Sequence, residues 1–439
     1  MLTSPGLDFA ALRRREFSRL DATGSAYLDY TGTALYPESL VKRDGRRLLR
    51  RVYGNPHSES APSLASTDVL EEARRLTLRF FDADPREYDL VFTANASGAI
   101  RILAEAFPFR DGSRLVLTAD NHNSVNGLRL PARRAGAEVE YVGLDGCLRG
   151  RDPRLWLPLT TAPSLFAFPA QSNFSGVRHP LGWVHEAQTR GYHVLLDAAA
   201  YAPTSALSLA QVPADFVAIS FYKMFGYPSG VGALLVRRQA LAALERRYFA
   251  GGTVQIVSVQ NDVVRARPGS GAFEDGTPNF LAMPAVCDGL RWLMRVGMAA
   301  IDQHVRSMTA ALLDRLSTLR DRVRVYGPTD LSGRGGVVAF NLYANGRALD
   351  YEMVEAAARE RGVAIRGGCF CNPGAAEHAF GLSAAQTAAC LDEDFSVARF
   401  RTCLGGLPVG AVRASIGPPT TPADLDRLLA LACELTAGS

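Results

Sequence analysis

The sequence predicts an α/β protein with a mainly parallel seven-stranded sheet and a second, smaller α+β domain. Between residues 90 and 236, short apolar runs alternate with helix-like or loop segments, a pattern typical of strand–helix–strand crossovers. The chain has 439 residues, well above the roughly 100–200 of one domain, so two domains are expected. We place the large domain at 30–285 and the small domain at 1–29 plus 286–439.

The seven expected strands are short apolar segments, most of them separated by a helix-length stretch. They are Leu90–Thr93, Arg114–Thr118, Glu138–Val142, Leu165–Phe168, His193–Asp197, Phe216–Ser220 and Gly232–Val236. Polar or reactive residues follow several of these strand ends, which is where open α/β sheets place their ligands.

The second half of the chain predicts the smaller domain. Ala282–Arg322 is rich in Ala, Leu, Met and Arg, and predicts one or two long helices leading out of the sheet. A strand at Gly336–Leu342, a helix at Leu349–Arg361, a strand at Val412–Ile416 and a helix at Ala423–Leu435 are expected to follow. Thr421–Asp424 supplies the start signal of the last helix.

Composition and charge narrow the class of protein. Hydrophobic residues make up 47% and charged residues 21%, and the net charge of +4 is spread along the chain, which argues against a nucleic-acid partner. No apolar run approaches the roughly 20 residues that span a bilayer, and Arg13–Arg15 lack the apolar segment of a secretory signal. Seven scattered cysteines are unlike a disulfide framework. We therefore expect a cytoplasmic protein with at least one free thiol and no membrane partner.

Lys223 is one of only two lysines, against 46 arginines. A lysine amine can form a Schiff base once desolvation removes its charge, whereas a guanidinium stays protonated. Lys223 follows an expected strand and is flanked by Tyr222 and Met224, which indicates an apolar pocket. The alternative is a lysine that lies along the surface at a strand end. Lys42, in a polar stretch, needs no special role.

Asp197 ends an apolar strand and is followed by three alanines. A carboxylate in such surroundings is costly unless it meets a cation, and the protonated pyridine nitrogen of pyridoxal phosphate (PLP) is such a cation. A helix-capping or loop aspartate is the common alternative. Because Asp197 lies one strand–helix–strand unit before Lys223, we favour a PLP site.

Two weaker signals agree with a PLP site. Phe92–Ala99 places small residues after a strand and before the helical stretch Ile100–Ala106, and phosphate binds backbone N–H groups at helix starts. His122 follows another strand, where its imidazole could stack on the cofactor ring. Alone, the first is an ordinary turn and the second an incidental loop histidine.

Several motifs carry a family resemblance. Tyr27–Tyr30, Tyr53–Ser58 and Phe92–Ala94 resemble fold-type I, class-V aminotransferase-like enzymes of the cysteine desulfurase group. Phe168–Gly176, Ser220–Lys223 and Gly368–Asn372 are most similar to the desulfurase domain of molybdenum cofactor sulfurases. The resemblance runs from about residue 27 to 428 and implies the PLP-dependent transferase fold type I.

The resemblance implies roles for individual residues. It implies that Lys223 carries the PLP, Asp197 pairs with the pyridine nitrogen, His122 stacks on the ring, Ala96, Ser97 and Ser220 lie at the phosphate, and Asn173 lies near the ring oxygen or substrate. Thr277 matches a position that reaches the phosphate of a neighbouring subunit, which implies a homodimer. Arg413 matches the arginine that binds the substrate α-carboxylate, for which guanidinium geometry is suited.

Cys371 matches the sulfur-accepting cysteine of the family, on a loop that begins at Arg366. Glycines and a proline around it predict a flexible backbone, and Arg366 is expected to favour the thiolate and to lie at the substrate with Arg413. The alternatives are buried structural cysteines or a Cys-x-Cys metal half-site. Because Cys390 and Cys403 are isolated in sequence, no metal is expected. The role of Cys369 stays open.

The leading hypothesis is PLP-dependent L-cysteine desulfuration. The Lys223 amine would remove the Cα proton, and the Cys371 thiolate would take the substrate sulfur as a persulfide, releasing alanine. The alternatives are a PLP-dependent lyase, decarboxylase or aminotransferase acting on another amino acid, or a non-catalytic sulfur carrier. Ala200 stands where many relatives carry glutamine. A second departure from the family is that no room for a C-terminal cofactor-binding domain is expected after Ser439. Because of this second departure, the sulfur acceptor is open.

Overall fold

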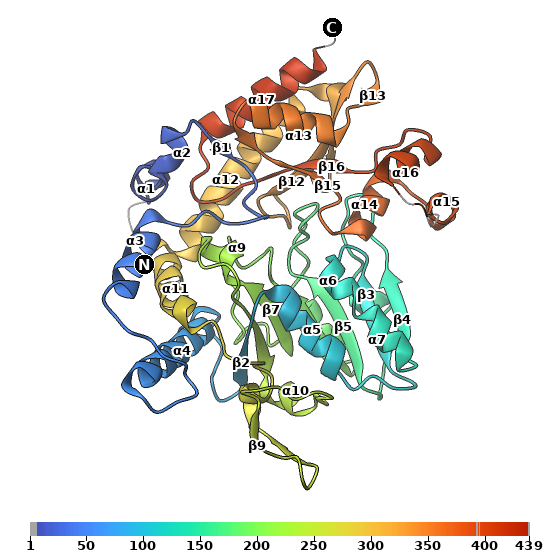
Figure 1. Ribbon diagram of the computed structural model, residues 1–439. Helices are drawn as coiled ribbons and strands as arrows, with labels where there is room; N and C mark the ends of the chain where they lie inside the picture. The colour runs from blue at the N-terminus through green and yellow to red at the C-terminus, as the bar shows by residue number, and fades with distance from the viewer. Residues whose placement is uncertain (1–6, 392–393, 395, 438–439) are drawn as a thin grey trace.

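The computed structural model describes residues 7–391, 394 and 396–437. Its central sheet has the strand order β2-β8-β7-β6-β5-β3-β4 (Figure 1). The strands are β2 (Tyr88–Thr93), β3 (Arg114–Thr118), β4 (Glu138–Val142), β5 (Ser164–Pro169), β6 (Tyr192–Asp197), β7 (Phe216–Ser220) and β8 (Gly232–Arg237). Strands β3 to β7 pair in parallel, and β8 is antiparallel to both of its neighbours. The predicted mainly parallel seven-stranded sheet is confirmed.

Alternate side chains of each strand enter two different apolar cores, because successive residues of a strand point to opposite faces. Leu115 and Leu117 pack with α5 (Ala96–Ala106) and α7 (Arg129–Arg134), whereas Val116 faces the core that includes α8 (Trp183–Gln188). Both faces of the sheet are therefore covered by helices, as buried parallel sheets require.

Two long helices connect the sheet to the rest of the chain. They are α11 (Met283–Val296) and α12 (Met298–Ser317), separated at Gly297, whose φ of +87° suits glycine. This confirms the prediction of helices over Ala282–Arg322. Helix α11 packs against α3 (Glu38–Leu48) and α4 (Ala61–Phe80). Because α11 begins at Met283, it is continuous across residue 285, where the boundary between the two domains is expected.

A second sheet lies in the C-terminal part, with the order β11-β12-β16-β15. Its strands are β11 (Val323–Tyr326), β12 (Val337–Ala344), β16 (Ala411–Ser415) and β15 (Arg366–Gly368), and β13 (Arg347–Ala348) pairs with β12. Helices α13 (Tyr351–Glu360) and α17 (Pro422–Thr436) pack on this unit, and Thr421 caps α17 as predicted. Strand β1 (Ala26–Tyr27) pairs in parallel with β14 (Val363–Ala364) in a separate two-stranded sheet, which joins the N-terminal segment to the C-terminal part. Residues 1–6 and 438–439 of the expected small domain lie outside the described residues.

The expectation that Cys390 and Cys403 are isolated is wrong. Helices α15 (Ala384–Cys390) and α16 (Val397–Cys403) bring Cys390 and Cys403 together as a disulfide, although 13 residues separate them in sequence. The sequence spacing gave no sign of this pairing, because the pairing depends on where the two short helices lie relative to each other. Both helices follow α14 (Pro373–Phe380).

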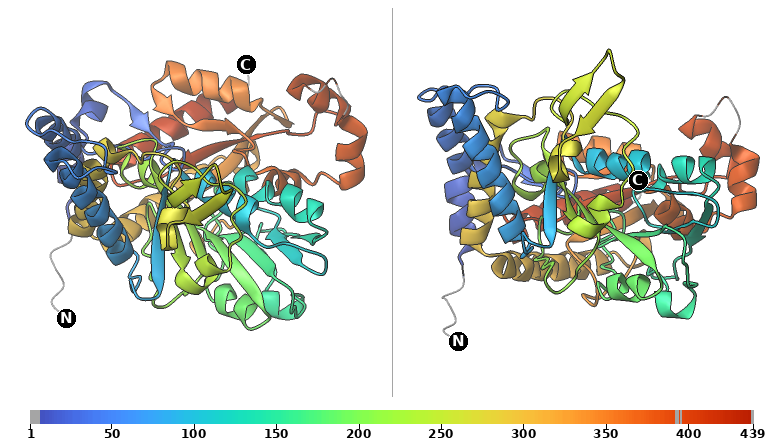
Figure 2. Two further views of the ribbon diagram at one scale, coloured as in Figure 1. Left: turned by 60° about the horizontal axis from the view of Figure 1, so that its bottom comes forward. Right: turned by 90° about the horizontal axis from the view of Figure 1, so that it is seen from below.

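The sequence also gave no indication of a β-hairpin. Strands β9 (Val254–Ser258) and β10 (Val263–Ala266) pair with each other and project from the body of the molecule (Figure 2). The remaining elements are α1 (Phe9–Glu16), α2 (Ser18–Ala22), α6 (Asn123–Asn126), α9 (Phe221–Phe225), α10 (Arg238–Ala242) and the 3-10 turns Pro153–Leu155, Gly269–Ala272, Phe280–Ala282 and Arg320–Arg322. Within the described part of the chain, no helix combines the length and apolar character needed to cross a membrane.

Candidate active site

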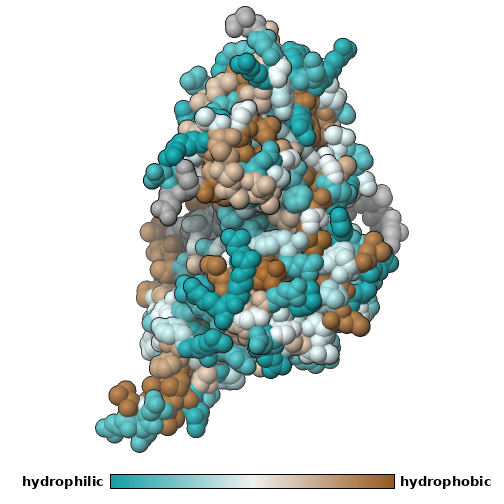
Figure 3. All heavy atoms as spheres, turned by 90° about the vertical axis from the view of Figure 1, so that its right-hand side faces the viewer, coloured by the Kyte–Doolittle hydropathy of each residue, from teal (hydrophilic) through white to brown (hydrophobic). Residues whose placement is uncertain are grey.

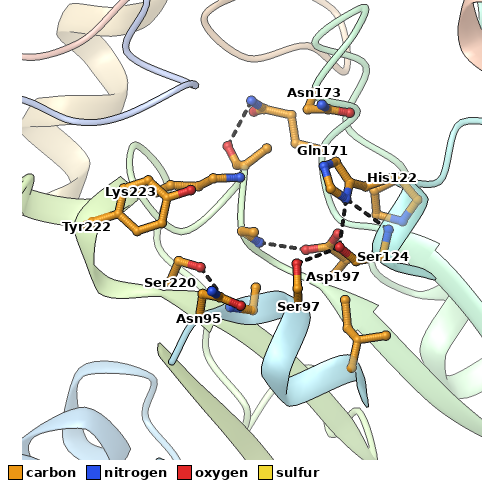
Figure 4. Close-up of a pocket in the computed structure, with 15 residues that line it drawn as sticks. Asn95, Ser97, His122, Ser124, Gln171, Asn173, Asp197, Ser220, Tyr222 and Lys223 are labelled. Atoms are coloured by element: carbon orange, nitrogen blue, oxygen red, sulfur yellow. Dashed lines mark hydrogen bonds between the residues drawn. The ribbon is translucent and has the colours of Figure 1, made fainter. Parts of the chain in front are cut away.

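A cavity of about 140 Å³ lies at the carboxyl ends of β5, β6 and β7, next to the start of α5 (Figure 4). Seven of the residues singled out in the sequence line it: Lys223, Asp197, His122, Ala96, Ser97, Asn173 and Ser220. Arg413, Arg366, Cys371 and Thr277 are not among its lining residues. The structure thus gathers every expected cofactor residue except Thr277 in one place, and it puts Arg413, Arg366 and Cys371 outside that cavity.

Lys223 lies in the short helix α9, directly after β7. The neighbouring side chains of Phe221 and Met224 are buried in the main core and fix the position of this helix. Burial lowers the pKa of the Lys223 amine, and the Asp197 carboxylate opposes that shift. A lowered pKa increases the fraction of the amine that is neutral, and both Schiff-base formation and proton abstraction require the neutral amine.

Asp197 is the last residue of β6 and is buried. Its Oδ1 accepts a hydrogen bond from the backbone N–H of Ala199 at 2.9 Å. Among the described residues, no Arg, Lys or His forms an ion pair with it within 4.0 Å. A buried carboxylate without a protein cation fits the pyridinium nitrogen of PLP.

The start of α5 can hold a phosphate. Asn95 caps the helix by accepting from the Gly98 N–H, and the Ala96 N–H donates to the Ser220 hydroxyl at 2.8 Å. The Ser97 hydroxyl lies 2.6 Å from the hydroxyl of Ser124. Backbone N–H groups and hydroxyls at a helix start are what a phosphate group binds. Ser124 was missed in the sequence, where nothing marks it except its position two residues after His122.

His122 precedes the short helix α6, and its Nδ1 accepts a hydrogen bond from the Ser124 backbone N–H at 3.1 Å. Burial lowers the pKa of the His122 imidazole, and the positive charges of Lys223 and Arg413 lower it further, against the opposing effect of Asp197. The lowered pKa favours a neutral ring, and the hydrogen bond that Nδ1 accepts places the remaining proton on Nε2. A neutral, planar imidazole suits the expected stacking on the PLP ring.

Cys371 is exposed and lies in a tight turn from Cys369 to Asn372. Phe370 and Cys371 have φ values of +57° and +55°, and the Asn372 N–H donates to the Cys369 carbonyl at 2.9 Å, as in a type I′ turn. This conformation is costly for residues other than glycine and must be held by its surroundings. The Phe370 carbonyl accepts from Asn173 Nδ2 at 2.7 Å, and the Cys371 carbonyl accepts from the Asn123 N–H at 2.8 Å.

Asn372 connects this turn to the cavity. Its buried side chain donates to the Asp120 carbonyl at 2.7 Å and to the Asn173 side-chain oxygen at 2.9 Å. Its own oxygen accepts from the Ala375 N–H and caps α14. The sequence predicts a flexible loop here, but the structure holds the turn through these contacts. Asn173 therefore lines the expected cofactor cavity and also contacts the turn of Cys371.

Arg413 lies in β16, and its guanidinium is buried over the ring of Phe370, 4.6 Å from the ring centroid. It donates to the Asn173 carbonyl at 2.9 Å and to the Asp29 carboxylate at 2.9 Å. Arg366, in β15, pairs with the same Asp29 carboxylate. Both arginines expected at the substrate are therefore already bound to a protein carboxylate to which the sequence assigned no role.

Two further residues complete the comparison with the sequence. Gln171 lines the cavity and donates to the Ala200 carbonyl at 3.0 Å. In the sequence it lies within the motif Phe168–Gly176, to which no role for Gln171 was attached. Thr277 accepts a hydrogen bond from Asn55 Nδ2 at 3.2 Å, outside the cavity of its own chain. Among the described residues, no group of three or more His, Cys, Asp or Glu side chains could hold a metal ion.

The sequence profile of the aminotransferase class-V family matches residues 26–428, so the chain belongs to this family. It is 35% identical to the molybdenum cofactor sulfurase of Bos taurus over 456 residues, covering 95% of this chain and 51% of that protein. The chain thus spans about half the length of that curated relative. The resemblance seen in the sequence motifs is confirmed.

Solved structures show the same fold. The cysteine desulfurase of Thermococcus onnurineus NA1 superposes with a TM-score of 0.79, 24% identity and full coverage of both chains. The cystine C-S lyase C-DES, in complex with its reaction product cysteine persulfide, gives a TM-score of 0.72 at 18% identity, covering 95% of this chain and 99% of that one. The predicted fold type I is confirmed.

Proposed function

We propose that the chain is a PLP-dependent L-cysteine desulfurase-like enzyme that moves the substrate sulfur to Cys371 and releases alanine. The observation that carries this proposal is the contact of Asn173 with both parts of the site. Asn173 lines the cavity of Lys223 and Asp197, and its amide holds the Phe370 carbonyl in the turn of Cys371. Membership of the class-V family and the similarity to a molybdenum cofactor sulfurase support the same reaction.

The cavity residues fit PLP one by one. Lys223 would hold it covalently, Asp197 would pair with the pyridine nitrogen, His122 would lie against the ring, and the start of α5 with Ser97, Ser124 and Ser220 would bind the phosphate. Bound there, PLP supplies an electron sink for the carbanion that forms at the substrate Cα.

The chain's own residues would perform the remaining chemistry. Arg413 would bind the substrate α-carboxylate, and the Lys223 amine would take the Cα proton. The Cys371 thiolate would then attack the substrate sulfur, so that an S–S bond forms as the substrate Cβ–S bond breaks. The electron pair of the broken bond stays on the substrate carbon, which takes up protons and leaves as alanine.

We also propose that two copies of the chain form a homodimer. Thr277 lies outside the cavity of its own chain, and the family resemblance matches it to a residue that serves a neighbouring subunit. The β9–β10 hairpin carries the exposed apolar side chains of Ile256, Val257, Val259 and Val264. Apolar side chains gathered on a projection are typical of surfaces that bind another chain. Figure 3 shows hydrophobic (brown) atoms on the projection at the bottom of the molecule, where Figure 1 places β9. The cytoplasmic location stays a prediction.

Product analysis tests the proposed reaction. The PLP-loaded protein is incubated with L-cysteine and, separately, with a panel of other amino acids, and the products are separated and identified. We expect alanine and persulfide sulfur in equal amounts from L-cysteine alone. Pyruvate with ammonia would indicate a lyase, an amine with carbon dioxide a decarboxylase, and a keto acid with an aminated cofactor an aminotransferase. Each of these would overturn the proposal.

A further inference from the structure

Asp29 occupies an unusual place between the two arginines of the candidate site. Its Oδ1 accepts from Arg413 Nη2 at 2.9 Å, and its Oδ2 accepts from Arg366 Nη2 at 2.7 Å. Arg366 Nε also donates to both oxygens, at 3.2 and 3.1 Å. One carboxylate therefore satisfies two guanidinium groups that come from neighbouring strands, β15 and β16.

The backbone around Asp29 fixes this arrangement. Asp29 forms a parallel bridge with Ser415, two residues beyond Arg413, and the Ser415 N–H donates to the Leu28 carbonyl at 2.6 Å. A side chain at Gly32 would lie 2.5 Å from the Asp29 carboxylate and 2.6 Å from the Arg366 guanidinium. The absence of a Cβ at this position therefore leaves the space in which the ion pair forms.

Charge explains why Arg413 requires such a partner. Its side chain is only 3% exposed, and a buried cation without a counter-charge is strongly destabilising. Its Nε–H has no hydrogen-bond partner among the residues that the structure describes, and its Nη1 donates to the Asn173 carbonyl. A carboxylate ligand that reaches Arg413 thus finds donors still available, but also meets the negative charge of Asp29.

We propose that Asp29 is a positioning residue that acts as an internal counter-ion, holding Arg413 and Arg366 in place and competing with the substrate α-carboxylate for them. This inference rests on the proposed function in one respect, the assignment of Arg413 to an amino-acid carboxylate. It adds that the affinity for that carboxylate is set by Asp29, and that Arg366 links carboxylate binding to the strand that leads into the Cys371 turn.

Binding of two amines that differ only in the carboxylate tests the proposal. L-alanine carries the amine and the carboxylate without a reactive sulfur, and ethylamine is the same molecule without the carboxylate. Binding of each to the PLP-loaded protein is followed by the change in cofactor absorbance, in wild type and in Asp29→Asn. We expect Asp29→Asn to bind L-alanine roughly tenfold more tightly, the scale of one charged hydrogen bond. Its affinity for ethylamine should not change.

A matched control separates this effect from the loss of any buried ion pair. Asp424 is likewise buried and pairs with Arg13, whose Nη1 donates to it at 2.6 Å, and it lies at the start of α17. Asp424→Asn should lower stability and leave both affinities as in wild type. If Asp29→Asn does not fold, judged by circular dichroism, Asp29→Ser is used, and the same tightening is expected.

Unchanged or weaker L-alanine binding in the Asp29 variants would overturn the proposal, and so would a wild-type protein with no preference for L-alanine over ethylamine. The titration needs no sulfur chemistry, so its result is distinguishable from that of the product analysis. Tighter L-alanine binding in a protein that does not desulfurate L-cysteine would support the role of Asp29 and reject the proposed reaction.

Discussion

At the scale of residues, the proposed chemistry depends on Lys223, because burial lowers the pKa of its amine in the cavity that Asp197 also lines. In the sequence, the rarity of lysine (one of only two in the chain) and the apolar neighbours of Lys223 indicated a reactive amine, and the structure places it in the cavity with Asp197 and His122. Asp29 could not be predicted in the same way. Its partners are more than 300 residues away in sequence, and only the pairing of β1 with β14 and of β15 with β16 brings them together.

Replacing Lys223 with Ala should remove covalent attachment of the cofactor. Without the amine, we expect loss of the visible absorbance of the attached PLP and a fall in turnover of about 10²–10⁴-fold, the usual contribution of a positioned general base. Absorbance spectra and alanine release measure the two effects. Lys42→Ala is the control, because Lys42 is exposed and pairs with Glu38 one helical turn away. Retained attachment in Lys223→Ala would contradict the assignment.

At the scale of elements, the local pattern of apolar residues predicted where the strands lie in the chain, but not which strands are adjacent in the sheet. Apolar runs marked all seven strands of the central sheet, whereas the antiparallel direction of β8 depends on how the chain returns after β7. The turn of Cys371 is a second case. Its glycines and proline predicted flexibility, but Asn173 and Asn123 hold it from outside, and Asn372, its last residue, anchors it through its side chain.

Asn372→Ala should loosen this turn without emptying the cofactor cavity. The change leaves the buried Asp120 carbonyl without its donor and should lower the free energy of unfolding by about 1–3 kcal/mol. Sulfur transfer to Cys371 should fall while PLP absorbance is retained. Denaturant unfolding and persulfide assays check both results. Asn123→Ala, exposed and still offering its backbone N–H to Cys371, should resemble wild type; an equal loss in both variants would refute the role of Asn372.

His304 predicts a pH dependence of stability. It stacks on Phe9 of α1 at 4.0 Å and contacts the Thr420 carbonyl, and burial lowers the pKa of its imidazole. Because the unfolded chain then binds a proton more readily than the folded chain, stability is present above about pH 6.5 and is lost as pH falls below it. The lowered pKa of His122 acts in the same direction.

Unfolding free energies measured above and below about pH 6.5 test this. His304→Gln keeps an N–H donor but does not titrate, so its stability should fall less steeply with acid than that of wild type. His185→Gln, in an exposed position on α8, should keep the wild-type slope. Identical slopes for wild type and His304→Gln would contradict this reading.

At the scale of the whole molecule, the proposed dimer gives the hairpin its function. Val259, at its tip, is 93% exposed, so a charge there should not disturb the folded monomer. If the tip is buried between two subunits, Val259→Asp places an unpaired carboxylate in an apolar contact, at a cost of several kcal/mol. We expect wild type to be dimeric and Val259→Asp to shift toward monomers in light scattering. Leu155→Asp, 84% exposed and remote from the hairpin in sequence, should stay dimeric.

The proposed reaction moves sulfur from L-cysteine to Cys371. The most direct measurement is mass spectrometry of the peptide that contains Cys371, isolated after the PLP-loaded protein has been mixed with L-cysteine. We expect one added sulfur atom on Cys371 in wild type and in Cys369→Ser, and none in Cys371→Ser or Lys223→Ala. An added sulfur on Cys369 instead, or alanine release with an unmodified Cys371, would contradict it.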